Sequence, residues 1–291
     1  MRQFAIRNEW GDQRSLTNKN GLFLITPDGL GAGSNGEYSR ITDGFFAATP
    51  KRPAQTEITG IIIAPKNAYR IYHDFVRWLM QSDDLQLMYR PSTDIGWYYI
   101  DVDVRMIEKG ELTRAGVLEA PISFAAKSPW YDMQPLTFAI PVDVPAKADI
   151  TYTRYPFVYG SVYPVSWSNN INSVDITVGG HLPAGIYMEY RGALTSPAIT
   201  LTQGKTEIGC MSLNTTITES ETLIFSTRPN ASGVWIMDAD GDIRDVYDKV
   251  DITRNAYFRV LPNTTYTLML TSSSAITTPA TVNIYQYYRS V

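Results

Sequence analysis

Two aspartates on one predicted strand are the residues whose type and spacing come nearest to a catalytic pair. Asp101 and Asp103 lie two residues apart in the alternating stretch 97–106, so both carboxylates point to the same strand face. A glycosidase uses two such carboxylates as acid and as base or nucleophile. Arg105 lies on the same face and offers them a charge partner. We therefore interpret these residues as a solvated, locally paired strand face rather than as a glycosidase site.

The segment 238–242, with sequence DADGD, resembles the beginning of a calcium loop. An EF-hand loop has glycine at its sixth position and a bidentate glutamate at its twelfth. Here the glycine is fourth, and Lys249 stands at the twelfth position. Asp240 and Gly241 are also typical of a tight turn between two strands. We predict a hairpin turn and no metal site, with a surface calcium ion near Asp238–Asp242 as the alternative.

The remaining groups that could do chemistry stand alone in the sequence. His73 and His181 are the two histidines, and neither has a companion at metal-ligand or catalytic-triad spacing. Cys210 is the single cysteine, which excludes an internal disulfide and predicts a small core residue. The glycine-rich segment 31–36 matches G-x-G-x-x-G, but a strand is predicted after it instead of the required helix. The sequence thus predicts no enzyme, no catalytic residue and no cofactor.

A helix over 67–81, between a buried strand at 61–63 and a strand at 85–89, is the best-patterned element. Asn67 is its predicted N-cap. Its polar residues share one face: Arg70, His73, Asp74, Arg77 and Gln81. The apolar residues, Tyr69, Ile71 and Trp78 among them, span an arc of about 200°, roughly twice what a surface helix hides. Either another layer of this chain or a neighbouring subunit must cover the excess, and both readings stay open.

A proline-broken segment precedes that helix. Phe45 and Phe46 are followed by Pro50, Arg52 and Pro53, and two prolines three residues apart disfavour regular strand pairing. We interpret the segment as an extended arm or loop. Such an arm commonly contacts a neighbouring subunit, while a plain surface loop is the alternative. The candidate subunit interface therefore consists of Tyr69, Ile71, Trp78, Phe45, Phe46, Pro50, Arg52 and Pro53.

The composition indicates a globular, mainly β chain with two domains. Of the 291 residues, 44% are hydrophobic and 19% are charged. Short strands are predicted at 3–7, 22–26, 38–42, 85–89 and 98–106. Prolines interrupt the pattern between 130 and 148, so we place the boundary between domains 1–133 and 134–291. From 150 onward about ten strands follow without a helix, for example 222–227, 234–237, 257–260 and 265–271, which predicts a β-sandwich of jelly-roll type.

The charge and hydropathy of the chain exclude several kinds of partner. A net charge of −4 lacks the basic field that sequence-specific nucleic-acid binding requires. No run approaches the length of a membrane span, and no signal-peptide pattern begins the chain. We therefore expect neither sequence-specific nucleic-acid binding nor membrane insertion.

The order of short motifs resembles that of the distal tail proteins of siphophages. In the first half the matching motifs are YxxYxxFxxWL at 69–79, LQLMY at 85–89, WYY at 97–99, EKGE at 108–111 and SPWY at 128–131. In the second half they are VGGHLPA at 178–184, MEYRG at 188–192 and SPAITL at 196–201. Each motif is short, and their order along most of the chain carries the resemblance.

The resemblance implies a structural protein of the virion, at the distal end of the phage tail and made in the host cytoplasm. Its fold would be an N-terminal β-sandwich-like, ring-forming domain with one helix, followed by a C-terminal galectin-like (jelly-roll) sandwich. Members of this family form hexameric rings between the tail tube protein and the tail-tip hub, and the outer domains often carry receptor-binding proteins. DNA would pass through such a ring. The alternative function is a carbohydrate-binding module or adhesin that uses the C-terminal sandwich for host-surface recognition.

Overall fold

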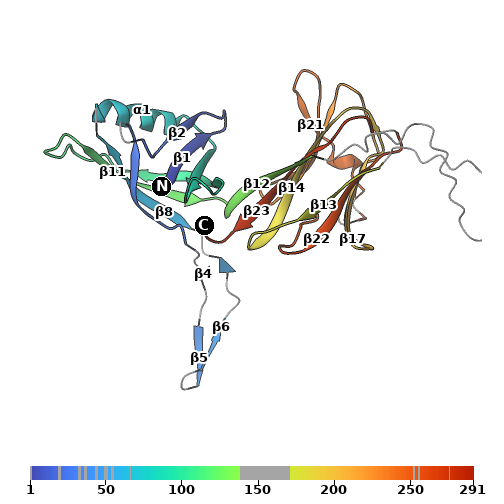
Figure 1. The fold of residues 1–291 in the computed structure, drawn as a ribbon, viewed down its shortest axis with the longest axis horizontal. Helices are drawn as coiled ribbons and strands as arrows, with labels where there is room; N and C mark the ends of the chain where they lie inside the picture. The colour runs from blue at the N-terminus through green and yellow to red at the C-terminus, as the bar shows by residue number, and fades with distance from the viewer. Residues whose placement is uncertain are drawn as a thin grey trace, which may run out of the picture. The chain divides into compact units, whose positions relative to one another are not determined.

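The computed structural model describes residues 2–137 and 171–291, apart from positions 19–20, 32–33, 36–37, 43–44, 49–51, 54–55, 66, 252, 255 and 275. The chain divides into two compact units, one formed by Met1–Asp132 with Tyr287–Val291 and the other by Met133–Gln286. The last residues of the chain thus belong to the N-terminal unit. The described part is mainly strand with one α-helix, which confirms the predicted fold class (Figure 1).

The N-terminal unit contains the helix and one long antiparallel ladder. Its elements are β1 (Gln3–Asn8), β2 (Gln13–Ser15), β3 (Phe23–Asp28), β4 (Ser34–Asn35), β5 (Tyr38–Thr42), β6 (Phe45–Ala48), β7 (Arg52–Pro53), β8 (Glu57–Ala64), α1 (Ala68–Met80), β9 (Leu85–Arg90), β10 (Tyr98–Ile107), β11 (Leu118–Ala126) and β12 (Trp130–Thr137). The ladder runs β2-β1-β9-β10-β11-β8-β3. Its predicted strands are confirmed, and β8 is longer than the 61–63 core of the prediction.

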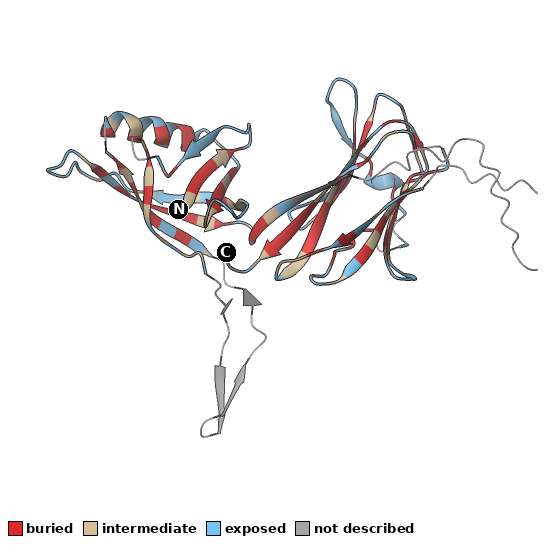
Figure 2. Ribbon diagram, viewed as in Figure 1, coloured by how far each residue is buried: buried red, intermediate tan, exposed pale blue. Residues whose placement is uncertain are grey.

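The two ends of this ladder are linked through Leu16. Its backbone amide donates to the carbonyl of Phe4 at 2.8 Å, and its carbonyl accepts from the amide of Leu24 at 2.8 Å. The Leu16 side chain is fully buried in the same core as Phe4 and Leu24. The curled sheet therefore encloses one apolar core, and α1 contributes Tyr72, Phe75, Trp78 and Leu79 to it. Figure 2 shows buried positions on α1 in red.

Helix α1 begins and ends within one residue of the predicted 67–81. Asn67 occupies the N-cap position, but it is left-handed, with φ 48°, and its side chain makes no capping hydrogen bond. The predicted polar face is confirmed, because Arg70, His73, Asp74 and Arg77 are all exposed. Among the described residues no helix has both the length and the apolar character needed to span a membrane.

The C-terminal unit is a sandwich of two antiparallel sheets. Its elements are β13 (Ile171–Thr177), β14 (Leu182–Arg191), β15 (Leu194–Thr195), β16 (Ala198–Gln203), β17 (Thr206–Ser212), β18 (Thr216–Ile217), β19 (Thr222–Arg228), β20 (Ala231–Met237), β21 (Ile243–Asp245), the 3-10 helix η1 (Tyr247–Lys249), β22 (Thr265–Thr271) and β23 (Thr281–Tyr288). One sheet has the order β13-β22-β16-β17, and the other includes β23-β14-β19-β20-β21. A galectin-like topology remains a prediction.

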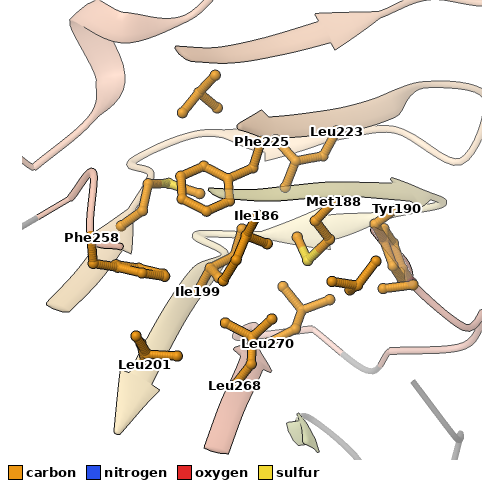
Figure 3. Close-up of a cluster of buried hydrophobic side chains, with 14 of the residues drawn as sticks. Ile186, Met188, Tyr190, Ile199, Leu201, Leu223, Phe225, Phe258, Leu268 and Leu270 are labelled. Atoms are coloured by element: carbon orange, nitrogen blue, oxygen red, sulfur yellow. The ribbon is translucent and has the colours of Figure 1, made fainter. Parts of the chain in front are cut away.

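The core of this sandwich lies between the two sheets. Figure 3 shows Ile186, Met188 and Phe225 from one sheet facing Ile199 and Leu270 from the other, and these residues are fully buried. Buried residues alternate with more exposed ones along β16 and β22, as expected for a sandwich, whereas β19 is buried from Thr222 to Thr227. Cys210 is buried and confirms its predicted role as a small core residue.

One strand prediction in this unit is wrong. The segment 257–260 forms no strand, and its single bridge pairs Val260 with Ala184. Phe258 is almost fully buried in the core, and Pro262 follows closely. The apolar residues of the segment were therefore a sign of core packing rather than of ladder pairing.

Candidate subunit interface

The apolar arc of α1 is covered largely by the chain itself. Tyr72, Phe75, Trp78 and Leu79 are buried and belong to the N-terminal core. Between the two readings that the sequence left open, another layer of the same chain thus accounts for most of the arc. What remains for a neighbouring subunit lies at the margins of this buried face.

Among the candidate interface residues on α1, Trp78 is the one that its own chain buries most completely. The residue is 8% exposed, and its ring stacks on Phe75 with the centroids 6.3 Å apart. The Arg14 guanidinium lies 5.7 Å from the centroid of the indole ring, within range of a cation–π contact. Arg14 lies on β2, far from Trp78 in sequence, so the helical pattern alone could not reveal this cover. Trp78 has little surface left to offer a partner.

Tyr69 and Ile71 lie at the edge of the buried face and are both half-buried. The Tyr69 hydroxyl donates to Glu111 Oε2 at 3.2 Å, and Lys109 Nζ lies 5.3 Å from the centroid of the ring. The loop between β10 and β11 therefore contacts the first turn of α1. Both residues keep exposed apolar area next to the core, which is compatible with the predicted contact.

The proline-broken segment contains two short ladders outside the main sheet. Phe45 and Phe46 lie on β6, which pairs with β5, and Arg52 and Pro53 lie on β7, which pairs with β4. Pro50 lies outside the described residues. Pairing at Arg52–Pro53 is limited to a two-residue ladder, which can accommodate proline at a strand end.

The N-terminal unit also exposes apolar side chains that were not predicted from the sequence as interface candidates. Trp10 is 67% exposed and Met80 is 63% exposed, and Met106 and Leu112 are also exposed. The Glu9 carboxylate accepts from the amides of Asp83 and Asp84 at 3.2 and 3.4 Å. This contact holds the turn that carries Trp10 beside the end of α1. The signal in the sequence is a tryptophan between Glu9 and Gly11 that belongs to no apolar pattern. This signal could have predicted that Trp10 is exposed.

The charged strand face of β10 is paired differently from the prediction. Asp101 accepts a hydrogen bond from the Tyr131 hydroxyl at 2.8 Å, and Asp103 pairs with Lys127 at 3.0 Å. Arg105 pairs with Glu57 of β8 at 3.3 Å rather than with either aspartate. Each carboxylate thus has a structural partner elsewhere in the unit, Tyr131 on β12 for Asp101 and Lys127 directly after β11 for Asp103. The geometry supports the interpretation of a paired strand face.

The candidate calcium segment is a hairpin turn, as predicted. Asp238 Oδ1 accepts from the amides of Asp240 and Asp242 at 3.0 and 2.9 Å, and Gly241 has φ 91°. The turn joins β20 to β21. Within the part of the chain that the structure describes, no group of three or more acidic, histidine or cysteine residues is placed to hold a metal ion.

Comparison with known proteins identifies the N-terminal unit. The sequence profile described as "Distal tail protein, N-terminal domain" matches residues 3–127. Over these residues the chain is similar to distal tail proteins. The resemblance predicted from the order of its motifs is confirmed. A search of curated proteins finds no match.

Solved structures of phage tail proteins share the fold over the whole chain. A chain from the phage P2 baseplate in its activated conformation with calcium has a TM-score of 0.68 at 16% identity, with 100% of both chains covered. The same baseplate with strontium gives the same values. The crystal structure of the SPP1 distal tail protein, described as a hub of the adsorption apparatus in phages that infect Gram-positive hosts, has a TM-score of 0.59 at 10% identity. It covers 97% of this chain and 98% of its own.

Proposed function

We propose that this protein is a structural component of a phage tail tip. Copies of its N-terminal unit assemble side by side into a closed ring, which we propose to be a hexamer. The family match over residues 3–127 is the observation that carries the proposal. Exposed apolar side chains of the N-terminal unit, such as Trp10 and Met80, are available for contacts within such a ring.

The proposed contact between neighbours uses the margin of α1 and the arm. Tyr69 and Ile71 supply apolar area beside the core, and Phe45, Phe46, Pro50, Arg52 and Pro53 supply the arm. Trp78 contributes indirectly, because it fixes the helix against the core from within. The proposed role requires no catalytic group and no cofactor.

The proposed place of the ring is the distal end of the virion tail, between the tail tube protein and the tail-tip hub. The baseplate and hub proteins that share the fold come from this part of other phages, which supports the location. DNA would pass through the ring, and receptor-binding proteins are the further proposed partners. Neighbours of these kinds contact the ring on different faces, so they need not compete with the contact between subunits.

Native mass measurement of the purified chain, with negative-stain microscopy over a range of concentrations, tests this proposal. We expect one closed species of defined subunit number and ring-shaped particles. A protein that stays monomeric at the highest concentration, with no rings in the images, would contradict it. Mixing with the purified tail tube protein of the same phage then tests the proposed position, with co-migration of the two as the expected result.

A further inference from the structure

An exposed tryptophan lies on the turn between β1 and β2. Trp10 is 67% exposed. Hydrogen bonds close the turn beneath it, because the Asn8 amide donates to the Asp12 carbonyl at 3.0 Å and the Asp12 amide donates to Asn8 Oδ1 at 2.8 Å. Gly11 has φ 85°, a left-handed conformation that glycine adopts without strain. The indole is therefore held out on a turn of defined shape, which lowers the entropy cost of burying it in a contact.

This turn lies next to the C-terminal end of α1 and carries negative charge. The Glu9 carboxylate accepts from the amides of Asp83 and Asp84, which follow the helix. The carboxylates of Asp12 and Asp83 are exposed, and neither forms an ion pair with the described part of the chain. Arg14, the cation of β2, lies over an indole ring of α1 instead. Three residues form what we name the turn surface: Trp10, Asp12 and Asp83.

The N-terminal end of α1 carries a second apolar surface, with positive charge. Tyr69 is half-buried in the first turn of the helix, and Leu112 is 42% exposed in the loop between β10 and β11. The hydrogen bond from Tyr69 to Glu111 joins this loop to the helix. Lys109, whose ammonium lies over the Tyr69 ring, and Arg70 are exposed and form no ion pair with described residues. Four residues form what we name the helix surface: Tyr69, Arg70, Lys109 and Leu112.

The two surfaces lie at opposite ends of the N-terminal unit. Figure 1 shows the β1–β2 turn, in dark blue, beyond one end of α1 and the β10–β11 loop, in green, beyond the other. The helix has 13 residues, so about 20 Å separates its ends. One chain therefore cannot bring its own two surfaces together. Two different surfaces at opposite ends of a subunit are what a head-to-tail contact needs, and such contacts can close into rings.

We propose that the turn surface of one copy docks on the helix surface of the next copy. The indole of Trp10 then covers the exposed parts of Tyr69 and Leu112, and the carboxylates of the turn surface face the cations of the helix surface. Tryptophan and tyrosine are enriched among the residues that dominate binding at interfaces. This inference rests on the ring proposed above and names the two surfaces that meet in it.

The charges of the two surfaces favour a second copy, docked head to tail, as the occupant. Contact of two turn surfaces would bring carboxylates against carboxylates, whereas contact of a turn surface with a helix surface pairs opposite charges. Glu119 of β11 does not cancel the positive charge near α1. It alternates with the buried residues Leu118 and Ala120, so its side chain points to the sheet face away from the core.

Native mass spectra of the full chain over a range of concentrations test the contact. Trp10→Ser should raise the subunit dissociation constant about tenfold or more, because the contact loses its indole. At a concentration where both proteins are monomeric, it should melt like the parent, since Trp10 is exposed in a single copy. Met106→Ser is the matched control. Met106 is 49% exposed on β10 and pairs with Ser123, on the sheet face away from α1, so this variant should assemble like the parent.

Charge reversal tests whether the two surfaces meet each other. Asp12→Lys and Lys109→Glu should each weaken assembly several-fold, because each places like charges across the contact. The double variant exchanges the two charges and should recover most of the lost affinity. Because the two positions lie at opposite ends of one unit, such a recovery requires a contact between copies.

Two results would overturn this contact and leave the ring standing. One is a Trp10→Ser protein that forms the parent's ring with the parent's dissociation constant. The other is a double variant, Asp12→Lys with Lys109→Glu, that assembles no better than the single variants. A parent chain that forms no closed species would instead contradict the proposed ring, and this contact with it.

Discussion

The two units differ in how completely they bury their own apolar side chains. Among the described residues, three partly buried hydrophobic side chains pack against the C-terminal core, whereas nine pack against the N-terminal core. A sandwich closes its core between two sheets, and outward positions can then be polar. In the N-terminal unit the core lies between the sheet and α1, and residues at the edge of the buried face of α1 reach the surface. The difference indicates that the sandwich is complete in itself, whereas the N-terminal unit gains more from a neighbour.

Trp78→Glu should have the largest effect of the changes considered, and it should act on folding. The substitution places a charge in the N-terminal core and removes the ring that packs on Phe75 and Arg14. We expect a loss of about 4 kcal/mol or more in the free energy of unfolding, measured by urea denaturation. Arg77→Glu, at the neighbouring exposed position, is the control and should cost about 0.5 kcal/mol or less. A stable Trp78→Glu protein that merely fails to assemble would place Trp78 at the subunit interface instead.

Leu268→Ala tests whether the C-terminal core is independent of assembly. Leu268 is fully buried on β22, so its truncation leaves a cavity in the sandwich. The expected cost is about 3 kcal/mol in the free energy of unfolding, again by urea denaturation. Native mass measurement below the unfolding transition should show the same subunit number as the parent protein. Loss of assembly in a folded Leu268→Ala protein would contradict the assignment of the ring to the N-terminal unit.

Ile71→Glu should separate assembly from folding. Ile71 is half-buried at the margin of the helix, so a glutamate there can reach solvent in the monomer at a cost of about 1 kcal/mol. In the ring the same charge would be buried, and we expect the subunit dissociation constant to rise about tenfold or more. Concentration-dependent native mass spectra measure it, with Arg77→Glu again as the control. Unfolding as severe as in Trp78→Glu would show that the chain itself covers Ile71.

Local sequence patterns predicted most of the helix and strand positions. The features that they did not predict depend on contacts between residues far apart in the chain. The polar face of α1 could be predicted because Arg70, His73, Asp74 and Arg77 recur at helical spacing. The burial of Trp78 could not, since it depends on Arg14 from a distant strand. Likewise, the apolar residues around Phe258 fit a strand in sequence but pack into the core without one. The neighbours Arg191, Thr222 and Met237 could not be predicted either, because the register of three strands places them side by side.

The smallest effect is expected at Asp132, a half-buried carboxylate of the N-terminal unit. Burial raises its pKa, and the hydrogen bond from the Tyr288 hydroxyl at 3.4 Å offsets part of that rise. Burial and the nearby Asp132 charge raise the pKa of Tyr288 to about 12, so the tyrosine stays a donor. Asp132 Oδ1 is buried without a hydrogen-bond partner among the described residues. The folded state therefore holds the proton of Asp132 more tightly than the unfolded state does.

Asp132→Asn tests this preference through its dependence on pH. A raised pKa in the folded state means that the unfolded state releases its proton first as the pH rises, so the ionised carboxylate destabilises the fold above the folded-state pKa. We expect Asp132→Asn to raise the melting temperature slightly at neutral pH and the gain to disappear below the usual range of an aspartate. Asp74→Asn, an exposed carboxylate on α1, is the control. A gain that stays constant down to low pH would show that packing of the amide, rather than relief of a buried charge, stabilises the variant.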